Sequence, residues 1–186
     1  MDTASQPGEL ALPMASAEPT LAPPPNAALF PASLIQELWQ TAEAQSLSLT
    51  PEEFAAALSA IGLKHNYNQP PGTSPTPAHQ AAFYRALRLP ELALAQACAL
   101  GREPAWHRFL SLYRAPLTQA AIAITGSATL GHDLADSLYA ELYGLSERDG
   151  QRRSPLASYS GRGSLLCWLR TTLAQRHIDH HRRTRR

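Results

Sequence analysis

The sequence predicts an all-α protein, a small helical bundle preceded by a Pro- and Ala-rich segment. Beyond residue 30, apolar residues recur at spacings of three and four, the period of one helix face, and no stretch shows the alternating β-branched pattern of a strand. Thirteen of the sixteen prolines lie at or before Pro90. We therefore expect the main bundle in the second half of the chain.

The chain of 186 residues is long enough for one ordinary domain with an extension. Residues 1–30 mix Ala, Pro, Ser and Thr without a helical or strand period, so we predict that they are disordered. Residues 31–65 are predicted to form a short helical appendix, and residues 66–84 a linker, because Pro and Gly interrupt the pattern there. The main helical domain is then expected over residues 85–186.

Two helices are expected in the appendix. The first lies within residues 31–47, and its apolar face is formed by Leu34, Ile35, Leu38 and Trp39. The second begins at Thr50, an N-cap that is followed by Pro at the first helical position and by two acids in the first turn. Its apolar face is formed by Phe54, Leu58 and Ile61.

Two further helices open the main domain. One runs from about Pro90 to Leu100, with Gly101 as its stop. A longer one starts near Glu103, and Pro116 within it is predicted to kink or break it. The buried stripe of this longer helix comprises Trp106, Phe109, Leu110, Tyr113, Leu117, Ala120, Ala121 and Ile124.

Two more helices complete the bundle. One follows Ser127 and ends at Gly144, with an apolar side of Leu134, Leu138 and Leu142 and an acidic outer face of Asp133, Asp136 and Glu141. After a polar loop over residues 146–160, Ser164 caps the last helix. The apolar side of that helix comprises Leu165, Leu166, Trp168, Leu169 and Leu173.

Charge is distributed unevenly along the chain. Residues 1–84 carry seven acids and one lysine, for a net charge of −6, and residues 85–149 have a net charge of −1. Residues 151–186 hold nine arginines against a single acid, Asp179, for a net charge of +8. The overall charge of +1 hides this asymmetry, which is typical of a polyanion contact at one end of a protein. A solvated basic tail is the alternative.

The apolar stripe of the last helix becomes cationic along its length. At 100° per residue, Leu165, Leu169 and Leu173 are continued by Arg176, His180 and Arg183, while Arg170, His177 and His181 widen the positive surface. Arginine is too costly to bury unpaired, so the helix is expected to leave the core about two turns before its end. The preceding loop, Tyr159 to Ser164, offers an aromatic ring, hydroxyls and backbone N–H groups, which suit a single-stranded or flipped base.

These residues resemble region 2 of a bacterial RNA polymerase sigma factor of the extracytoplasmic-function type. The pattern comprises Ala105 to Tyr113, Asp133-Leu134, Tyr159 to Arg170, Asp179 and Arg182-Arg183. It covers roughly residues 90–186. Its most specific part is the segment from Tyr159 to Arg170, Tyr-Ser-Gly-Arg-Gly-Ser-Leu-Leu-Cys-Trp-Leu-Arg.

The resemblance implies a bundle of the region 2 type that directs transcription initiation. Its implied partners are core RNA polymerase, through the clamp helices of the largest subunit, the single-stranded −10 region of promoter DNA, and an anti-sigma factor. The implied polymerase-binding residues are Asp133, Asp136 and Glu141. The implied DNA-binding residues are Tyr159, Arg162, Ser164, Arg170, Arg176, His177, His180, Arg182 and Arg183. Trp168 is expected to be a core anchor rather than a base contact.

The sequence departs from the family pattern at two places. Family members usually carry Gln-Glu or Gln-Asp where this chain has Asp136-Ser137, and their usual asparagine is replaced near Gln175-Arg176. An alternative function is therefore a sigma-like interaction protein or adaptor, which holds the polymerase clamp without opening DNA. In that case the acidic helix would be functional and the arginines would be incidental.

Other functional classes find little support. Two of the three histidines His177, His180 and His181 could face one metal ion from adjacent helical turns, but no cysteine or further histidine lies nearby, so no metal or other cofactor is expected. No nucleophile–base pair is visible, and no enzyme is expected. Cys98 and Cys167 are expected to be buried, reduced thiols. Without a basic leader or an apolar run of ~18 residues, a cytoplasmic protein without membrane contact is expected.

Overall fold

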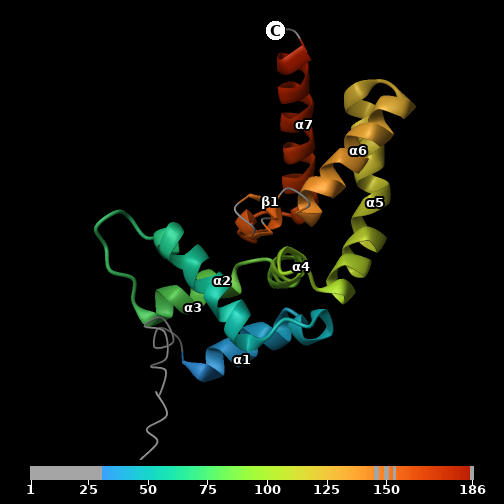
Figure 1. Ribbon diagram of the computed structural model, residues 1–186. Helices are drawn as coiled ribbons and strands as arrows, with labels where there is room; N and C mark the ends of the chain where they lie inside the picture. Colours follow the sequence, from blue (N-terminus) through green and yellow to red (C-terminus); the bar gives the residue numbers. More distant parts are fainter. Residues whose placement is uncertain (1–30, 145–146, 149–150, 153, 185–186) are drawn as a thin grey trace, which may run out of the picture.

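The computed structural model describes residues 31–144, 147–148, 151–152 and 154–184, of which the side chains at 147–148, 151–152, 181 and 183–184 are not described. The described residues form seven α-helices, three 3₁₀ turns and one antiparallel pair of two-residue strands (Figure 1). The prediction of an all-α protein is confirmed. The segment predicted to be disordered, residues 1–30, lies outside the described residues.

Three helices form the N-terminal layer: α1 (Ala32–Thr41), α2 (Pro51–Lys64) and α3 (Pro77–Arg85). Helix α2 begins as predicted, because the Thr50 hydroxyl accepts the backbone N–H of Glu53 and the Glu53 carboxylate accepts that of Thr50. Helix α1 is shorter than predicted. Glu43 adopts a left-handed backbone with φ 52°, and a 3₁₀ turn, η1 (Ala44–Leu47), follows it.

The prediction of a linker over residues 66–84 is wrong for the second half of that range. A 3₁₀ turn, η2 (Asn66–Asn68), opens this segment, but α3 occupies its end. The Thr76 hydroxyl accepts the backbone N–H of His79, and Pro77 takes the first helical position. A proline after threonine starts a helix as readily as it marks a loop, which explains the error.

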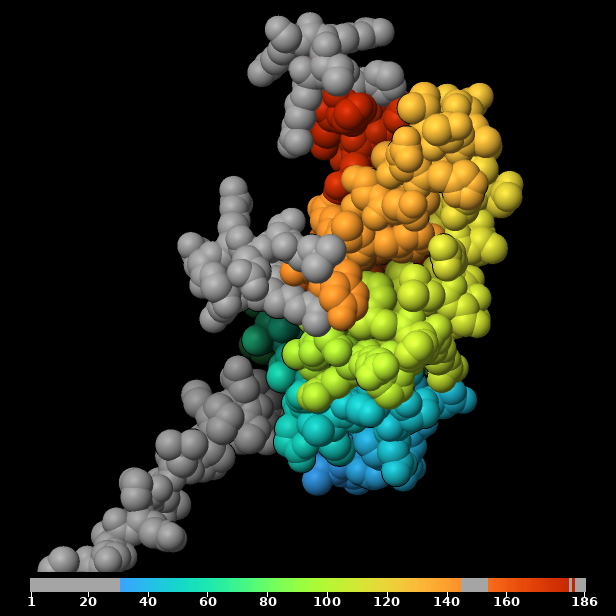
Figure 2. Space-filling model, turned by 45° about the vertical axis from the view of Figure 1, so that its right-hand side comes forward, coloured from blue at the N-terminus to red at the C-terminus, as the bar shows by residue number. Residues whose placement is uncertain are grey.

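The N-terminal helices are not a separate appendix, because they share one hydrophobic core with the rest of the chain. Leu38 of α1, Phe54 of α2 and Tyr84 of α3 are at most 1% exposed and belong to the cluster that also holds Leu92 and Phe109. In Figure 2 the surface of the N-terminal helices, blue to cyan, continues into the green and yellow surface of the following helices without a gap. The predicted boundary near residue 65 therefore does not divide the core.

Helix α4 (Leu89–Ala99) lies between the N-terminal layer and the antiparallel pair α5 (Glu103–Thr125) and α6 (Ala128–Tyr143) (Figure 1). Helix α5 continues through Pro116, so the predicted break is absent. Proline removes the hydrogen bond to the carbonyl of residue 112, and Leu112 is 51% exposed, on the solvent side of the helix. Tyr113 and Leu117 are buried on either side and hold the helix together.

Helices α5 and α6 approach closely at Gly131. We expect Gly131→Ala to lower the free energy of unfolding by about 1–3 kcal/mol, as overpacking does. The added Cβ would lie 2.7 Å from both Cα and N of Ile122, and backbone atoms cannot move aside without separating the two helices. Gly163→Ala is the matched control, since nothing lies within 4 Å of its added Cβ. Urea denaturation compares the two variants, and equal stability would contradict the close approach.

The chain then passes the strands β1 (Glu147–Arg148) and β2 (Gln151–Arg152) and the 3₁₀ turn η3 (Pro155–Ser158), and ends in α7 (Leu165–Thr184). Leu165, Leu169 and Leu173 of α7 are buried, and beyond Leu173 none of its described side chains is. The prediction that this helix leaves the core is confirmed, and Figure 1 shows its far end standing away from the bundle. Among the described helices, none is long and apolar enough to span a membrane.

Candidate nucleic-acid interface

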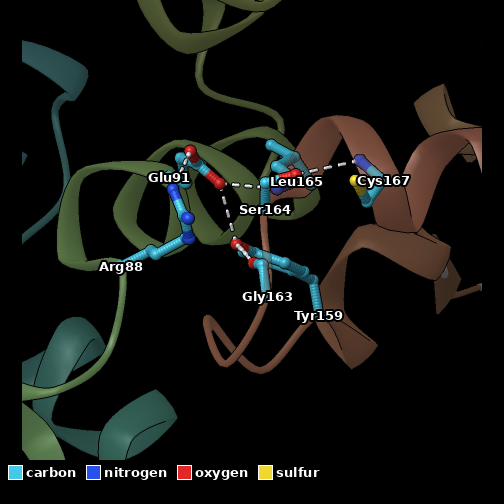
Figure 3. Close-up of polar contacts among 7 residues, drawn as sticks. All are labelled: Arg88, Glu91, Tyr159, Gly163, Ser164, Leu165 and Cys167. Atoms are coloured by element: carbon cyan, nitrogen blue, oxygen red, sulfur yellow. Dashed lines mark hydrogen bonds and ion pairs between the residues drawn. The ribbon is translucent and has the colours of Figure 1, made fainter.

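The loop before α7 begins with Tyr159, and this side chain is buried. Tyr159 is only 2% exposed, and its ring packs edge-on against Trp168 at a centroid distance of 6.0 Å. Its hydroxyl lies 3.0 Å from Oε2 of Glu91 and 2.6 Å from the Gly163 carbonyl oxygen, so one proton serves two acceptors (Figure 3). The prediction that Tyr159 stacks on a base is wrong, because stacking needs an exposed ring face.

Glu91, in the first turn of α4, lies at the centre of this arrangement (Figure 3). Its Oε2 also accepts the backbone N–H of Leu165 at 2.5 Å, and its Oε1 lies 3.5 Å from Nη1 of Arg88. Burial, and then the negative charge of Glu91, raise the pKa of the Tyr159 hydroxyl. Sequence analysis missed Glu91, because an acid in a first turn is an ordinary helix-start signal.

Two further hydrogen bonds fix the loop. The Gly161 carbonyl accepts the backbone N–H of Arg88 at 2.8 Å, and Gly161 takes a left-handed φ of 72° that favours glycine. The Ser164 hydroxyl accepts the backbone N–H of Cys167 at 3.2 Å, so the predicted cap of α7 is confirmed. The Ser164 hydroxyl, which was predicted to hold a nucleotide, therefore caps α7 instead, while the Gly161 carbonyl ties the loop to the start of α4.

Arg162 lies apart from this network, against the end of α2. Its side chain is exposed, and Nη1 is 3.0 Å from Nδ1 of His65, the C-cap of α2. A guanidinium can only donate, so Nδ1 accepts and the imidazole is neutral in this contact. Burial, and then the charges of Arg162 and Lys64, lower the pKa of His65. Arg162 therefore brings a cation to the N-terminal layer.

Helix α7 presents several of the predicted DNA-binding side chains to solvent. Arg170, His180 and Arg182 are exposed, and His177 is half-buried. Arg182 lies near one acid, with Nη1 3.9 Å from the Asp179 carboxylate. The side chain of Arg183 lies outside the described residues.

Arg176 folds back onto α6, contrary to its predicted place on the open cationic face. It forms an ion pair with Glu141, and its Nε and Nη2 donate to the Ser137 hydroxyl at 3.0 Å and 2.6 Å. Because the Glu141 carboxylate is paired with Arg176, Glu141 is not free for the polymerase contact that was predicted for it. The outward acids of α6 are then Asp133 and Asp136, which are exposed and form no ion pair with a described residue.

Helices α6 and α7 diverge and enclose a groove of 890 Å³. Its walls are apolar at Leu134 and Trp168 and polar at Asp133, His177 and His180. Leu134 was predicted to face the core; it is half-buried, packs against the core and also lines this groove. Trp168 is half-buried and packs against the core, as expected of an anchor. The groove places the acidic helix opposite the cationic one.

The histidines of α7 and the two cysteines are the remaining residues that the sequence analysis considered. No group of three or more His, Cys, Asp or Glu side chains within the described part of the chain could hold a metal ion. The side chain of His181 is outside that part. Cys98 is buried as expected, but Cys167 is exposed, because it lies on the outer side of α7.

Comparison with known proteins finds no similarity that identifies the chain: no protein-family model matches it, and no similar curated protein or solved structure is found.

Proposed function

We propose that residues 85–186 act as a sigma-factor region 2 domain, which binds core RNA polymerase in the cytoplasm and recognises and opens the −10 promoter element. The observation that carries the proposal is the exit of α7 from the core with Arg170, His180 and Arg182 exposed along it. This helix directly follows the segment from Tyr159 to Arg170, where the resemblance to the family is most specific.

The proposed surface differs from the set implied by the sequence. Arg170, His180 and Arg182 of α7, with Arg162 of the loop, contact the DNA backbone, because all four side chains are exposed. Tyr159 and Ser164 contribute indirectly. Their side chains do not contact the DNA, but their hydrogen bonds fix the start of α7. Asp133 and Asp136 on α6 meet basic residues of the polymerase clamp.

We expect Arg170→Glu to weaken binding of a labelled single-stranded oligodeoxynucleotide about tenfold, because a phosphate contact becomes a repulsion. The salt slope should fall by about 0.7, the value for one phosphate on a single strand. Arg114→Glu on α5 is the matched control, since Arg114 is also exposed and forms no ion pair with a described residue. Fluorescence anisotropy at several salt concentrations measures both, and equal affinities would reject the α7 surface.

The alternative, an adaptor that holds the polymerase without opening DNA, is favoured by two observations. The Arg176–Glu141 ion pair neutralises part of the cationic face, and Tyr159 is not available to a base. The two functions separate in a pull-down with bacterial core RNA polymerase. Asp133→Lys should impair polymerase binding in both cases, whereas Arg170→Glu should impair oligonucleotide binding only for a sigma factor.

A further inference from the structure

The C-terminal end of α2 meets the loop before α7, and no described carboxylate forms a salt bridge with a cation of α2's last turn or with Arg162 of the loop. Arg162 of the loop reaches His65 at 3.0 Å, and Lys64 precedes His65 as the last residue of α2. A groove of 190 Å³ lies beside Lys64, between α2, α4 and residues 157–160. Its described walls are neutral except for Lys64, with Gln96, Ser158 and Ser160 as polar members.

Other cations at the border of the N-terminal layer are paired with its acids. Arg102 binds Glu53 at 2.5 Å, and Arg108 binds Glu43 at 3.1 Å. The junction of α2 and the loop differs, because each side contributes a cation: Lys64 comes from α2 and Arg162 from the loop. Lys64 and Arg162 form no salt bridge with any described residue. Lys64 is also the one lysine of the chain and the one Lys or Arg in residues 1–84.

Like charges at short range cost free energy unless an opposite charge lies between them. The negative end of the α2 dipole amounts to about half a unit charge and offsets only part of two full cations. A net positive charge therefore remains, and it is felt locally, since the charges of Arg162 and Lys64 both lower the pKa of His65. A bound anion would relieve this repulsion.

We propose that Lys64 and Arg162, which lie on either side of the neutral His65, form an anion-binding patch that takes phosphates of a nucleic-acid strand passing from the loop before α7 onto the end of α2. The inference rests on the proposed function, and it gives the N-terminal layer a part in the same contact. The strand is a suitable ligand because its phosphates repeat along an extended backbone and can reach both Lys64 and Arg162. Arg162 supplies a planar fork for one phosphate, and Lys64 a point charge for another.

The test compares Lys64→Glu and Arg162→Glu with Arg170→Glu and Arg114→Glu in the full chain, using a labelled single-stranded oligodeoxynucleotide. Each patch variant should weaken binding about three- to tenfold and lower the salt slope by about 0.7. Arg114→Glu should bind like the wild type. Lys64→Gln and Arg162→Gln remove the positive charge without adding a negative one, so they should lose less affinity than the Glu variants. They also control for misfolding caused by charge reversal. Thermal melting checks the fold of each variant.

The outcomes separate the two proposals. If Lys64→Glu binds like Arg114→Glu while Arg170→Glu is weak, the patch is rejected and the sigma-factor proposal stands. If only the patch variants are weak, the patch stands and the α7 surface is rejected. If the wild type binds neither this strand nor its duplex, both proposals fail.

Discussion

Phe54→Ala should lower the free energy of unfolding by about 3–5 kcal/mol, the cost of removing a fully buried aromatic ring. Phe54 lies in α2 and is 0% exposed, within the core cluster that also includes Leu92 of α4 and Phe109 of α5. The lost ring leaves a cavity that close-packed neighbours fill only in part. Leu63→Ala on the same helix is the control, because Leu63 is 59% exposed and should change stability little.

The same variant tests whether the N-terminal layer is part of the domain. Because the core is continuous, Phe54→Ala should retain one cooperative urea transition with a lower midpoint. Hydrogen exchange followed by mass spectrometry should then be faster in α4 and α5 as well as in α1–α3. If exchange accelerates only in residues 31–85, the N-terminal helices unfold alone and the single core is disproved.

Glu91→Ala should lower the free energy of unfolding by about 1.5–3 kcal/mol, the range for hydrogen bonds to a charged group. The carboxylate accepts from Tyr159 and from the backbone N–H of Leu165, at 3.0 Å and 2.5 Å. Without it the buried Tyr159 hydroxyl keeps only the Gly163 carbonyl, and the start of α7 loses an acceptor. Urea denaturation measures the loss.

The control for this variant is Glu103→Ala. Glu103 is also a first-turn acid, of α5, but its side chain is 86% exposed, and its carboxylate lies 3.5 Å from Nε2 of His107. Subtracting the two effects removes the shared interaction with a helix dipole, so the remainder reports on the contacts to the loop. Glu91→Gln should retain part of the stability, since its amide oxygen can still accept. Equal losses for Glu91→Ala and Glu103→Ala would show that Glu91 does not hold the loop.

The expected function depends on this rigid start of α7. The loop was predicted to capture a base, yet its contacts are turned inward and its exposed cation, Arg162, faces α2. A fixed loop sets the direction of the helix and with it the position of Arg170. The proposed DNA contact is therefore a surface of exposed cations around a rigid junction.

Local signals in the sequence were sufficient for most of the secondary structure. The caps at Thr50 and Ser164 and the exit of α7 after Leu173 were predicted, because each depends on neighbouring residues or on a helical period. The Pro-rich stretch before α3 was misread, since Thr-Pro occurs both in turns and at helix starts. The candidate site was predicted less well, because burial there depends on partners from distant segments.

The sequence by itself determined the all-α fold class, the starts of α2 and α7 and the cationic character of α7, because composition and spacing act within a few turns of chain. Only the tertiary structure decided which of these side chains face solvent. Tyr159 hydrogen-bonds to Glu91, 68 residues away, and Arg176 hydrogen-bonds to Ser137, 39 residues away. No local pattern encodes such pairs, since they form only when the helices pack, and packing also brings Arg162 to the end of α2.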